Sequence, residues 1–506
     1  MLVEWARQCP ISTSFKTKFK SEKQLLKFMH IRNLCTLLCL STILSGNAWA
    51  KSNKKVDKND IWAQGAALAE SIKAPEFPDK EFVITDFGAS KTADAITNMV
   101  AINKAIEEAS NKGGGRVLVP YGQWLTGPIT LKSNVNLVLE NGSTLLFSRE
   151  REHYLPVVRT RWEGIDCYNL RPLIYANGEK NFAITGQGTI DGQASNDYWW
   201  YSCGASWYGY KAGLLKTNNG NTNSGRPMLG KMEQEKVPVD ERIMTIADAL
   251  RPQLVNFYEC EQVMIEGVTL RNSPFWVIHP CFVNNMIVRG VTIISHGPNS
   301  DGCDPECSKN VLIEDCYFDT GDDCIAIKSG RNNDGRAIDI RSENIIVRRC
   351  KMKNGHGGVV IGSEITSGFS NLWVEDCDMD SPELERVIRI KSNTCRGGVI
   401  ENVFVRNVRV GQCKEAVLKI NLDYDRKEVC DRSFPPVVRN VNLENVTSQK
   451  SKYGVLIIGL EDKTNVEDVM VKNCSFNGVQ LGNKSTGLTK NVKSQNLLIN
   501  GKKTEL

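Results

Sequence analysis

The sequence predicts an all-β fold, a single-domain right-handed parallel β-helix with a short N-terminal capping helix. Three observations support this prediction: one motif recurs nine times after residue 180, the copies show the period of two that is typical of strands, and the clearest helical pattern precedes the copies. One coil cannot bury its apolar side chains alone, so successive coils must stack. The predicted parts are a leader in residues 1–50, an N-terminal extension in 51–80 and the β-helix in 81–506, interrupted by an inserted loop at about 193–250.

The recurring motif is a polar residue, usually Asn, then an alternating apolar run, a charged residue, Asp, Asn or Gly, and finally Cys or Val. Its copies are NFAITGQ from Asn181, QVMIEGV from Gln262, NMIVRGV from Asn285, NVLIEDC from Asn310, NIIVRRC from Asn344, NLWVEDC from Asn371, NVFVRNV from Asn402, NVNLENV from Asn440 and DVMVKNC from Asp468. From Gln262 onward, successive copies start 23 to 38 residues apart. The period of two indicates strands. Leucine-rich repeats are the main alternative, but their consensus is missing and the spacing is irregular.

Residues 97–112 carry the helical pattern. The predicted apolar face holds Val100, Ile102, Ala105, Ile106 and Ala109, and Gly113-Gly114-Gly115 ends the helix. Such a helix would cover the open end of the β-helix, where strand edges and apolar surface are exposed. The three glycines precede a strand rather than a helix, as does GQGTIDG after Gly186, so neither stretch predicts a phosphate or dinucleotide site.

The leader around Met29 reads as a signal peptide. A basic stretch is followed by an apolar core over residues 34–44 and by Ala48-Trp49-Ala50, so we expect cleavage and a periplasmic or secreted protein. Met29 is itself a candidate start. No later segment approaches the roughly 20 apolar residues of a membrane-spanning helix, so no membrane span is expected.

The basic net charge of the chain belongs to the leader. Residues 1–50 hold seven Lys/Arg and two Asp/Glu, which leaves 56 of each sign in the remainder. Attraction to a polyanion must therefore come from a local basic patch, and no nucleic-acid partner is expected. The oligomeric state stays open, with a monomer favoured.

The cysteines do not form an obvious disulfide framework. Cys316, Cys350, Cys377 and Cys474 occupy one place in the repeat, where we expect them to stack as small buried apolar residues. The roles of Cys303, Cys307, Cys413 and Cys430 stay open.

The strands that follow four successive repeats bring acidic and basic residues into register. The segments are SDGCDPEC from Ser300, DDCIAIKS from Asp322, HGGVVIGS from His356 and ERVIRIKS from Glu385. Aligned as columns, Asp301 stacks on Asp323 and His356 on Asp322; Asp304, Ala326, Val360 and Arg389 form one further column, and Glu306, Lys328, Gly362 and Lys391 another. Neighbouring strands lie about 4.8 Å apart, so the three aspartates and His356 share one patch. Charges on a sheet are often solvated, but three carboxylates level with His, Arg and Lys favour a site.

Paired carboxylates suit glycoside hydrolysis, which needs one group to protonate the leaving oxygen and another to activate water. Close carboxylates raise one another's pKa, so one can stay protonated. An inverting reaction calls for about 6.5–9.5 Å between acid and base. Arg389 and Lys391, two residues apart on one strand face, suit a substrate carboxylate. Alternatively, they balance the charges of Asp304 and Glu306.

Four motifs resemble the polygalacturonases of glycoside hydrolase family 28. They are Asn299-Ser300-Asp301-Gly302, Gly321-Asp322-Asp323, Gly355-His356-Gly357 and Arg389-Ile390-Lys391, in the family's order. The resemblance covers essentially the whole chain after the leader and implies inverting hydrolysis of α-1,4-galacturonide bonds in pectin or polygalacturonate. It implies that Asp322 is the general acid, that Asp301 and Asp323 hold and activate water, and that His356 tunes the acid. Arg389 and Lys391 would bind the galacturonate carboxylate, without a metal or other cofactor.

Three further segments are similar to bacterial exo-acting members of that family: RPQLVNFYEC from Arg251, NSPFWVIHP from Asn272 and GPNSDGCDPE from Gly297. We therefore expect exo action, with Asn299 and His279 as further substrate-binding residues. The inserted loop is well placed to close one end of a cleft. Its seven aromatics, Tyr198, Trp199, Trp200, Tyr201, Trp207, Tyr208 and Tyr210, either face sugar rings or pack the loop onto the β-helix.

Three alternatives remain at this point. A pectate lyase would abstract a proton, commonly with calcium, and would be sensitive to EDTA and yield an unsaturated product. A non-catalytic polysaccharide-binding β-helix, such as an adhesin or tailspike, would leave the polysaccharide unchanged. A rhamnogalacturonan or xylogalacturonan hydrolase would share the family, but His356 and Arg389-Ile390-Lys391 favour plain galacturonate on both sides of the bond.

Overall fold

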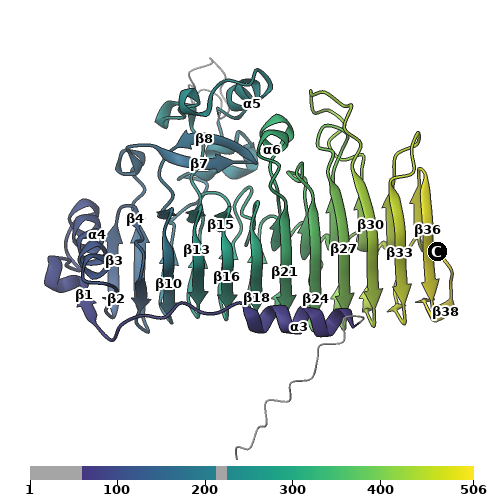
Figure 1. The fold of residues 1–506 in the computed structure, drawn as a ribbon, viewed down its shortest axis with the longest axis horizontal. Helices are drawn as coiled ribbons and strands as arrows, with labels where there is room; N and C mark the ends of the chain where they lie inside the picture. Colours follow the sequence, from purple (N-terminus) through teal and green to yellow (C-terminus); the bar gives the residue numbers. More distant parts are fainter. Residues whose placement is uncertain (1–59, 212–224) are drawn as a thin grey trace, which may run out of the picture. The chain divides into compact units, whose positions relative to one another are not determined.

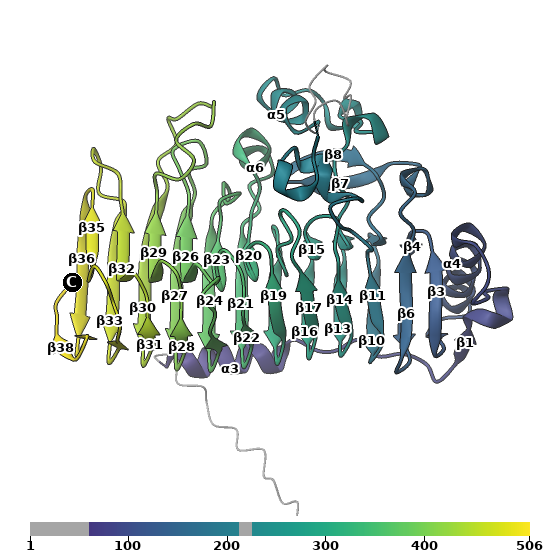
Figure 2. The ribbon, with the colours of Figure 1, turned by 180° about the vertical axis from the view of Figure 1, so that it is seen from behind.

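A computed structural model describes residues 60–211 and 225–506; the leader and part of the insertion lie outside these ranges. In residues 61–506, each coil contributes strands to three parallel sheets that run along the stack (Figures 1 and 2). The chain is a right-handed parallel β-helix, as predicted. Within the described residues, no helix is long and apolar enough to cross a membrane.

The first sheet, sheet A, contains all nine predicted repeats as nine successive strands. Its strands in spatial order are β1 (Glu81–Val83), β2 (Gly115–Val119), β5 (Val135–Leu139), β10 (Lys180–Gly186), β13 (Glu261–Glu266), β16 (Asn284–Arg289), β18 (Lys309–Glu314), β21 (Ser342–Arg348), β24 (Phe369–Glu375), β27 (Val399–Arg406), β30 (Val437–Glu444), β33 (Val466–Lys472) and β36 (Thr489–Gln495). The repeats run from β10 to β33, which confirms the predicted stacking.

Sheets B and C complete each coil. Sheet B comprises β3 (Gly122–Thr126), β6 (Ser143–Phe147), β11 (Thr189–Asp191), β14 (Thr269–Arg271), β17 (Thr292–Ser295), β19 (Tyr317–Thr320), β22 (Lys351–Met352), β25 (Asp378–Met379), β28 (Arg409–Gln412), β31 (Thr447–Lys450), β34 (Ser475–Phe476), β37 (Leu498–Ile499) and the antiparallel β38 (Lys502–Lys503). Sheet C comprises β4 (Ile129–Thr130), β9 (Ile174–Asn177), β12 (Val255–Tyr258), β15 (Ile278–Cys281), β20 (Ile325–Ile327), β23 (Val359–Ile361), β26 (Arg386–Lys391), β29 (Ala416–Asn421), β32 (Tyr453–Ile458) and β35 (Lys484–Thr486). Single bridges through Cys303 connect β15 to β20.

The structure explains why a polar residue, usually Asn, begins each repeat. Asn310, Asn344, Asn371, Asn402 and Asn440 all have positive φ angles, which asparagine tolerates better than most residues. Each side-chain amide donates to the side-chain oxygen of the residue one coil earlier, at 2.7 to 3.1 Å from Asn344 onward. The positive φ angle lets the chain turn into sheet A. The hydrogen bonds between successive Asn side chains give each side-chain amide a partner, so asparagine is well suited to the start of each repeat.

Residues at equivalent positions of successive repeats also stack in the core. The cysteines at the end of four repeats, Cys316, Cys350, Cys377 and Cys474, are buried thiols, which confirms that they act as small apolar residues. Of the cysteines whose role was open, Cys303, Cys307 and Cys413 are also free and buried. Cys430 forms a disulfide with Cys395.

Helix α4 (Ala95–Asn111) packs against the first strands of the stack, as predicted for a cap. It begins two residues earlier than expected, because the Asp94 carboxylate accepts a hydrogen bond from the Thr97 amide (2.8 Å) and caps the helix. Ile102 and Ile106 are fully buried. Val100 is 56% exposed, so its placement on the apolar face was wrong.

A second helix, α3 (Ile61–Ser71), was not predicted; it lies in the N-terminal extension and covers the outer face of sheet A (Figure 1). Its residue Ala69 joins a buried cluster with side chains that point outward from the sheet, among them Leu312 and Ile346. Gly65 lies against the ring of Trp373, where a Cβ would stand 2.8 Å from the ring. The helix therefore shields apolar residues that would otherwise face water.

Several segments project from sheet C over the middle of the stack (Figures 1 and 2). Strands β7 (Val158–Trp162) and β8 (Ile165–Asn169) form an antiparallel hairpin. The insertion contains short 3-10 helices at Trp200–Cys203, Ser206–Tyr208, Val239–Glu241 and Ile246–Asp248, and helix α5 (Arg226–Gln234), so its described part has more regular structure than predicted. Helix α6 (Asn332–Ile338) follows β20. Two further 3-10 helices lie at Ile84–Phe87 and Arg151–Tyr154.

Candidate active site

The predicted columns are present in sheet C. Residue 303 pairs with 325 and 325 with 359, which places Asp301 level with Asp323 and His356 level with Asp322. Ala326, Val360 and Arg389 share a column, as predicted. The three aspartates converge: one carboxylate oxygen of each lies within 4.8 Å of the other two. The register read from the sequence is therefore correct.

A hydrogen-bonded turn holds Asp301 in place. The hydroxyl of Ser300 donates to the carbonyl oxygen of Ser295 (2.6 Å) or of Gly297 (2.7 Å), and the amide of Gly321 donates to this hydroxyl (3.2 Å). The last bond connects the turn to the bend that carries Asp322, just before β20. A side-chain hydroxyl is sufficient for these contacts, and Ser300 supplies it.

Asp322 and His356 form a hydrogen-bonded ion pair. His356 Nδ1 lies 2.9 Å from Asp322 Oδ1. Burial by itself would raise the pKa of Asp322, but the hydrogen bond and charge of His356, with Lys391 and Lys328, lower it below its ordinary value. The same hydrogen bond, against the effect of burial, raises the pKa of His356 to about 9. At neutral pH, the proton of this pair resides on the imidazole.

Asp323 is fully buried and ion-paired on both oxygens. Lys391 Nζ lies 2.7 Å from Oδ2, and Arg389 Nη1 lies 3.4 Å from Oδ1. A Cβ on Gly357 would clash with Val360 Cγ2 and stand 3.1 Å from Asp323 Oδ1, which explains the second glycine of Gly-His-Gly. The basic pair balances Asp323, rather than Asp304 and Glu306 as the alternative expected, and still lines the cavity.

Asp301 differs electrostatically from Asp322. Burial, followed by the charges of Asp322 and Asp304, raises the pKa of Asp301 well above its ordinary value, while Lys328 opposes this rise. Carboxylates this close titrate as a unit. The raised pKa of Asp301 and the lowered pKa of Asp322 mean that Asp322 is the more readily ionised of the two, whereas the family resemblance assigns the acid role to Asp322.

Asp301 and Asp322, but not the buried Asp323, line a cavity of about 340 Å³. Its wall includes Glu163 at the tip of the β7–β8 hairpin, Arg226 at the start of α5 and Arg331 after β20. The Glu163 carboxylate connects the other two, with Oε2 at 2.8 Å from Arg226 Nε and 3.2 Å from Arg331 Nη1. This ion-paired wall was not predicted, because its parts come from three separate loops.

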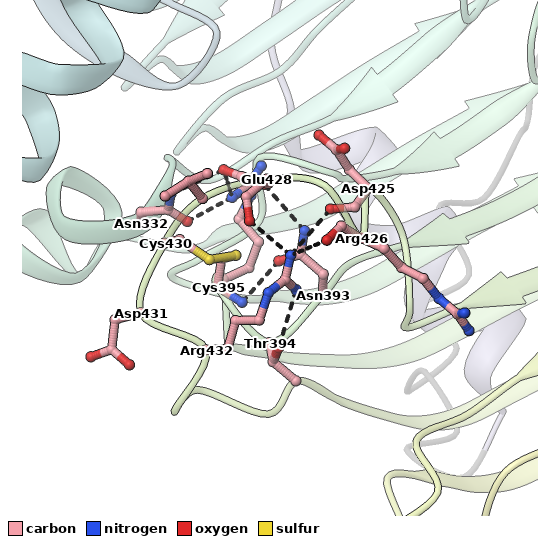
Figure 3. The surroundings of a disulfide bond; sticks show 12 residues. Asn332, Asn393, Thr394, Cys395, Asp425, Arg426, Glu428, Cys430, Asp431 and Arg432 are labelled. Carbon is pink, nitrogen blue, oxygen red and sulfur yellow. Dashed lines mark hydrogen bonds and ion pairs between the residues drawn. A yellow bond between two sulfur atoms is a disulfide. The ribbon is translucent and has the colours of Figure 1, made fainter.

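A disulfide-braced loop forms another part of the wall (Figure 3). Cys430 is bonded to Cys395, and the Glu428 carboxylate accepts hydrogen bonds from Arg396 (2.6 Å) and Asn393 (3.2 Å). The loop brings Tyr424 into the cavity, where its ring lies 5.5 Å from both Arg389 Cζ and Lys391 Nζ. Sequence reasoning missed this tyrosine, since no repeat motif contains it.

Of the two additional residues expected to bind substrate, the structure brings only Asn299 to the cavity. Asn299 lines it, with its side-chain oxygen held by Arg251 (2.7 Å). His279 is fully buried: its Nε2 lies 2.8 Å from Glu306 Oε2, and its ring packs against Trp276. His279 does not line the cavity, so its assignment was wrong, because its outward-facing strand position is covered by the β7–β8 hairpin.

Two of the described aromatics of the insertion have the packing role, one of the two roles that were expected. Trp199 is buried against Tyr154, and the indole nitrogen of Trp200 donates to the Ser273 carbonyl oxygen (2.9 Å), so both pack the insertion onto the β-helix. Trp207 is 75% exposed and lies near Tyr208. A sugar-facing role for Trp207 stays a prediction.

Two clusters of described residues have the donor types of a metal site: the three aspartates, and His279 with Cys281 and Glu306. Both already contain protein cations. Lys391 and Arg389 pair with Asp323, and Arg161 Nη1 lies 3.1 Å from Glu306 Oε1. A metal ion would face these positive charges at short range, so neither cluster has the chemistry of a strong cation site.

Comparisons with known proteins agree with this geometry. The model of "Glycosyl hydrolases family 28" matches residues 245–497. A hyperthermoactive exopolygalacturonase from Thermotoga maritima is 40% identical, with a TM-score of 0.81 over 87% of this chain and 98% of its own. An endo-polygalacturonase from Pectobacterium carotovorum is 28% identical over 84% of this chain and 93% of its own. An exo-poly-alpha-D-galacturonosidase from Dickeya chrysanthemi is 27% identical over 72% of this chain and 62% of its own.

Proposed function

Because the chain belongs to glycoside hydrolase family 28 and is a hydrolase of the polygalacturonase type, we propose that it removes sugars from one end of polygalacturonate by an inverting acid/base reaction. The observation that carries the exo assignment is the ion-paired wall of Glu163, Arg226 and Arg331 in the cavity of the aspartates. We infer that this wall closes one end of the cavity, so that the terminal sugar of a polymer chain can enter it but the chain cannot run past it.

In the proposed reaction, the Asp322–His356 pair is the acid. The pair holds one proton on the imidazole in the free protein. As the bond to the leaving oxygen breaks, Asp322 delivers a proton to that oxygen and His356 supplies its replacement across the 2.9 Å hydrogen bond. His356 is then a proton donor to Asp322 and not only a residue that adjusts its pKa. This role is consistent with the lowered pKa of Asp322.

Asp301 and Asp323 hold the attacking water. Asp323 is committed to Arg389 and Lys391 on both oxygens, so it orients the water and Asp301 accepts the proton. The three carboxylates are closer together than the roughly 6.5–9.5 Å typical of inverting pairs. We nevertheless favour inversion, from the family resemblance and because two carboxylates share the water while a third is the acid.

Substrate recognition follows from the same basic pair. Arg389 and Lys391 line the cavity beside the ring of Tyr424. A guanidinium fork and an ammonium suit a galacturonate carboxylate on a sugar held at the cleavage point. The proposed substrate is therefore polygalacturonate or a pectin oligosaccharide.

Early products from reducing-end-labelled oligogalacturonates test the exo assignment. We expect the label to move down by a constant step, with mono- or digalacturonate as the only other product. EDTA and ultraviolet absorbance would be followed in parallel, and we expect neither inhibition nor an unsaturated product. A spread of product lengths at early times would contradict exo action, and an unsaturated product would indicate a lyase.

A further inference from the structure

Lys328, which follows β20, is a buried lysine with no role in the reaction described above. Its Nζ lies 3.2 Å from Glu364 Oε2 and 3.8 Å from Asp301 Oδ2. The same atom lies 4.4 Å from the centre of the Trp276 ring. An ammonium is costly to bury, and this one is enclosed among carboxylates and an aromatic face. Two carboxylates and an aromatic ring therefore hold the ammonium group of Lys328 in place.

The surroundings of Lys328 are mainly acidic. The charged groups that face it are Asp301, Asp304, Asp322, Asp323, Glu306 and Glu364, with His279 and Lys391 nearby; those that face Asp301 are Asp304, Asp322, Asp323 and Lys328. Both oxygens of Asp304 lack a hydrogen-bond partner. Among the described residues, Lys328 is the cation that forms an ion pair with Asp301, whereas Arg389 and Lys391 form ion pairs with Asp323.

We propose that Lys328 is a positioning residue that opposes protonation of Asp301 and orients its carboxylate toward the attacking water. The inference rests on the proposed function, which makes Asp301 the proton acceptor. Glu364 competes with Asp301 for the same ammonium and lies closer to it. A stronger contact of Lys328 with Glu364 therefore leaves less of its positive charge to act on Asp301, and a weaker contact leaves more.

The pH profile of kcat/KM on oligogalacturonates tests this role, since its acid limb reports groups of the free enzyme that must be ionised. Removing a neighbouring cation raises a carboxylate pKa, so we expect Lys328→Met to move the acid limb up by about one pH unit. Glu364→Gln should move it down, because Lys328 then acts on Asp301 without a competitor. Lys328→Arg keeps the charge and should restore most of the wild-type profile.

Lys353→Met is the matched control. Lys353 is an ion-paired lysine that lies 3.2 Å from Asp319 and does not line the cavity. An acid limb that stays at the wild-type pH in Lys328→Met, or moves equally in Lys353→Met, overturns the proposal. If Lys328→Met does not fold, an unmoved limb in Glu364→Gln overturns it. Failure of the wild-type protein to cleave oligogalacturonates would instead refute the proposed function.

Discussion

Replacing Asp322 with asparagine is expected to lower kcat on polygalacturonate by about 10²–10⁴-fold, the usual contribution of a general acid. Asparagine preserves the size of the side chain and can still accept the hydrogen bond from His356, but it cannot pass on a proton. Initial rates of reducing-end release measure the loss. Circular dichroism and thermal unfolding are expected to resemble those of the wild-type protein, because no core contact is removed.

Asp378→Asn is the control for this variant. Asp378 on β25 is also ion-paired, at 2.6 Å from Arg409 Nε, but it lies on sheet B outside the cavity. Its removal should leave kcat unchanged. A folded Asp322→Asn variant with a kcat close to that of the wild-type protein would exclude Asp322 as the acid and would move attention to Asp301, whose pKa is raised.

Removing the guanidinium of Arg389 is expected to weaken substrate binding by about 1.5–3 kcal/mol, the range for a hydrogen bond to a charged group. Asp323 keeps its shorter contact to Lys391, so the carboxylate is not left without a cation. Calorimetric titration of trigalacturonate into Asp322→Asn, with and without Arg389→Ala, separates binding from chemistry.

Arg389→Lys completes the comparison, since it keeps the charge but loses the planar fork. We expect it to recover only part of the affinity. Arg409→Ala removes an exposed ion-paired arginine and should not change binding. Equal affinities with and without Arg389 would show that its charge serves Asp323 and not the substrate.

The sequence predicts which site residues lie side by side because successive strands of sheet C pair in the register expected from the alignment of the repeats. Asp301, Asp322, Asp323 and His356 lie within 56 residues of one another, and equivalent positions in successive coils are level in a parallel sheet. The position of each side chain along its strand was therefore sufficient to bring the residues together.

The register of the strands does not predict contacts between the loops. His279 points outward from its strand, but the hairpin that carries Arg161 covers it, and nothing in the strand pattern indicates this cover. The wall of Glu163, Arg226 and Arg331 likewise joins loops of unrelated length. Position in the chain alone does not predict such contacts.

Helix α3 had a signal that was available in the sequence. Several repeats carry three apolar residues in succession, such as Val311, Leu312 and Ile313, where a strand exposed on one face would alternate. The outward residue Leu312 is buried beneath the cover of α3. Continuous apolar runs in these strands indicate that both faces of sheet A are covered, although they do not identify the covering segment.

The configuration of the first sugar released tests the central claim most directly. Proton NMR spectra recorded within the first minutes of cleavage, before mutarotation, distinguish the two anomers. Inversion at an α-linkage predicts that the β-anomer appears first and that the α-anomer follows as the sugar equilibrates. Initial release of the α-anomer would contradict the proposed water-sharing role of Asp301 and Asp323 and would instead match a covalent mechanism, which the short carboxylate separation also permits.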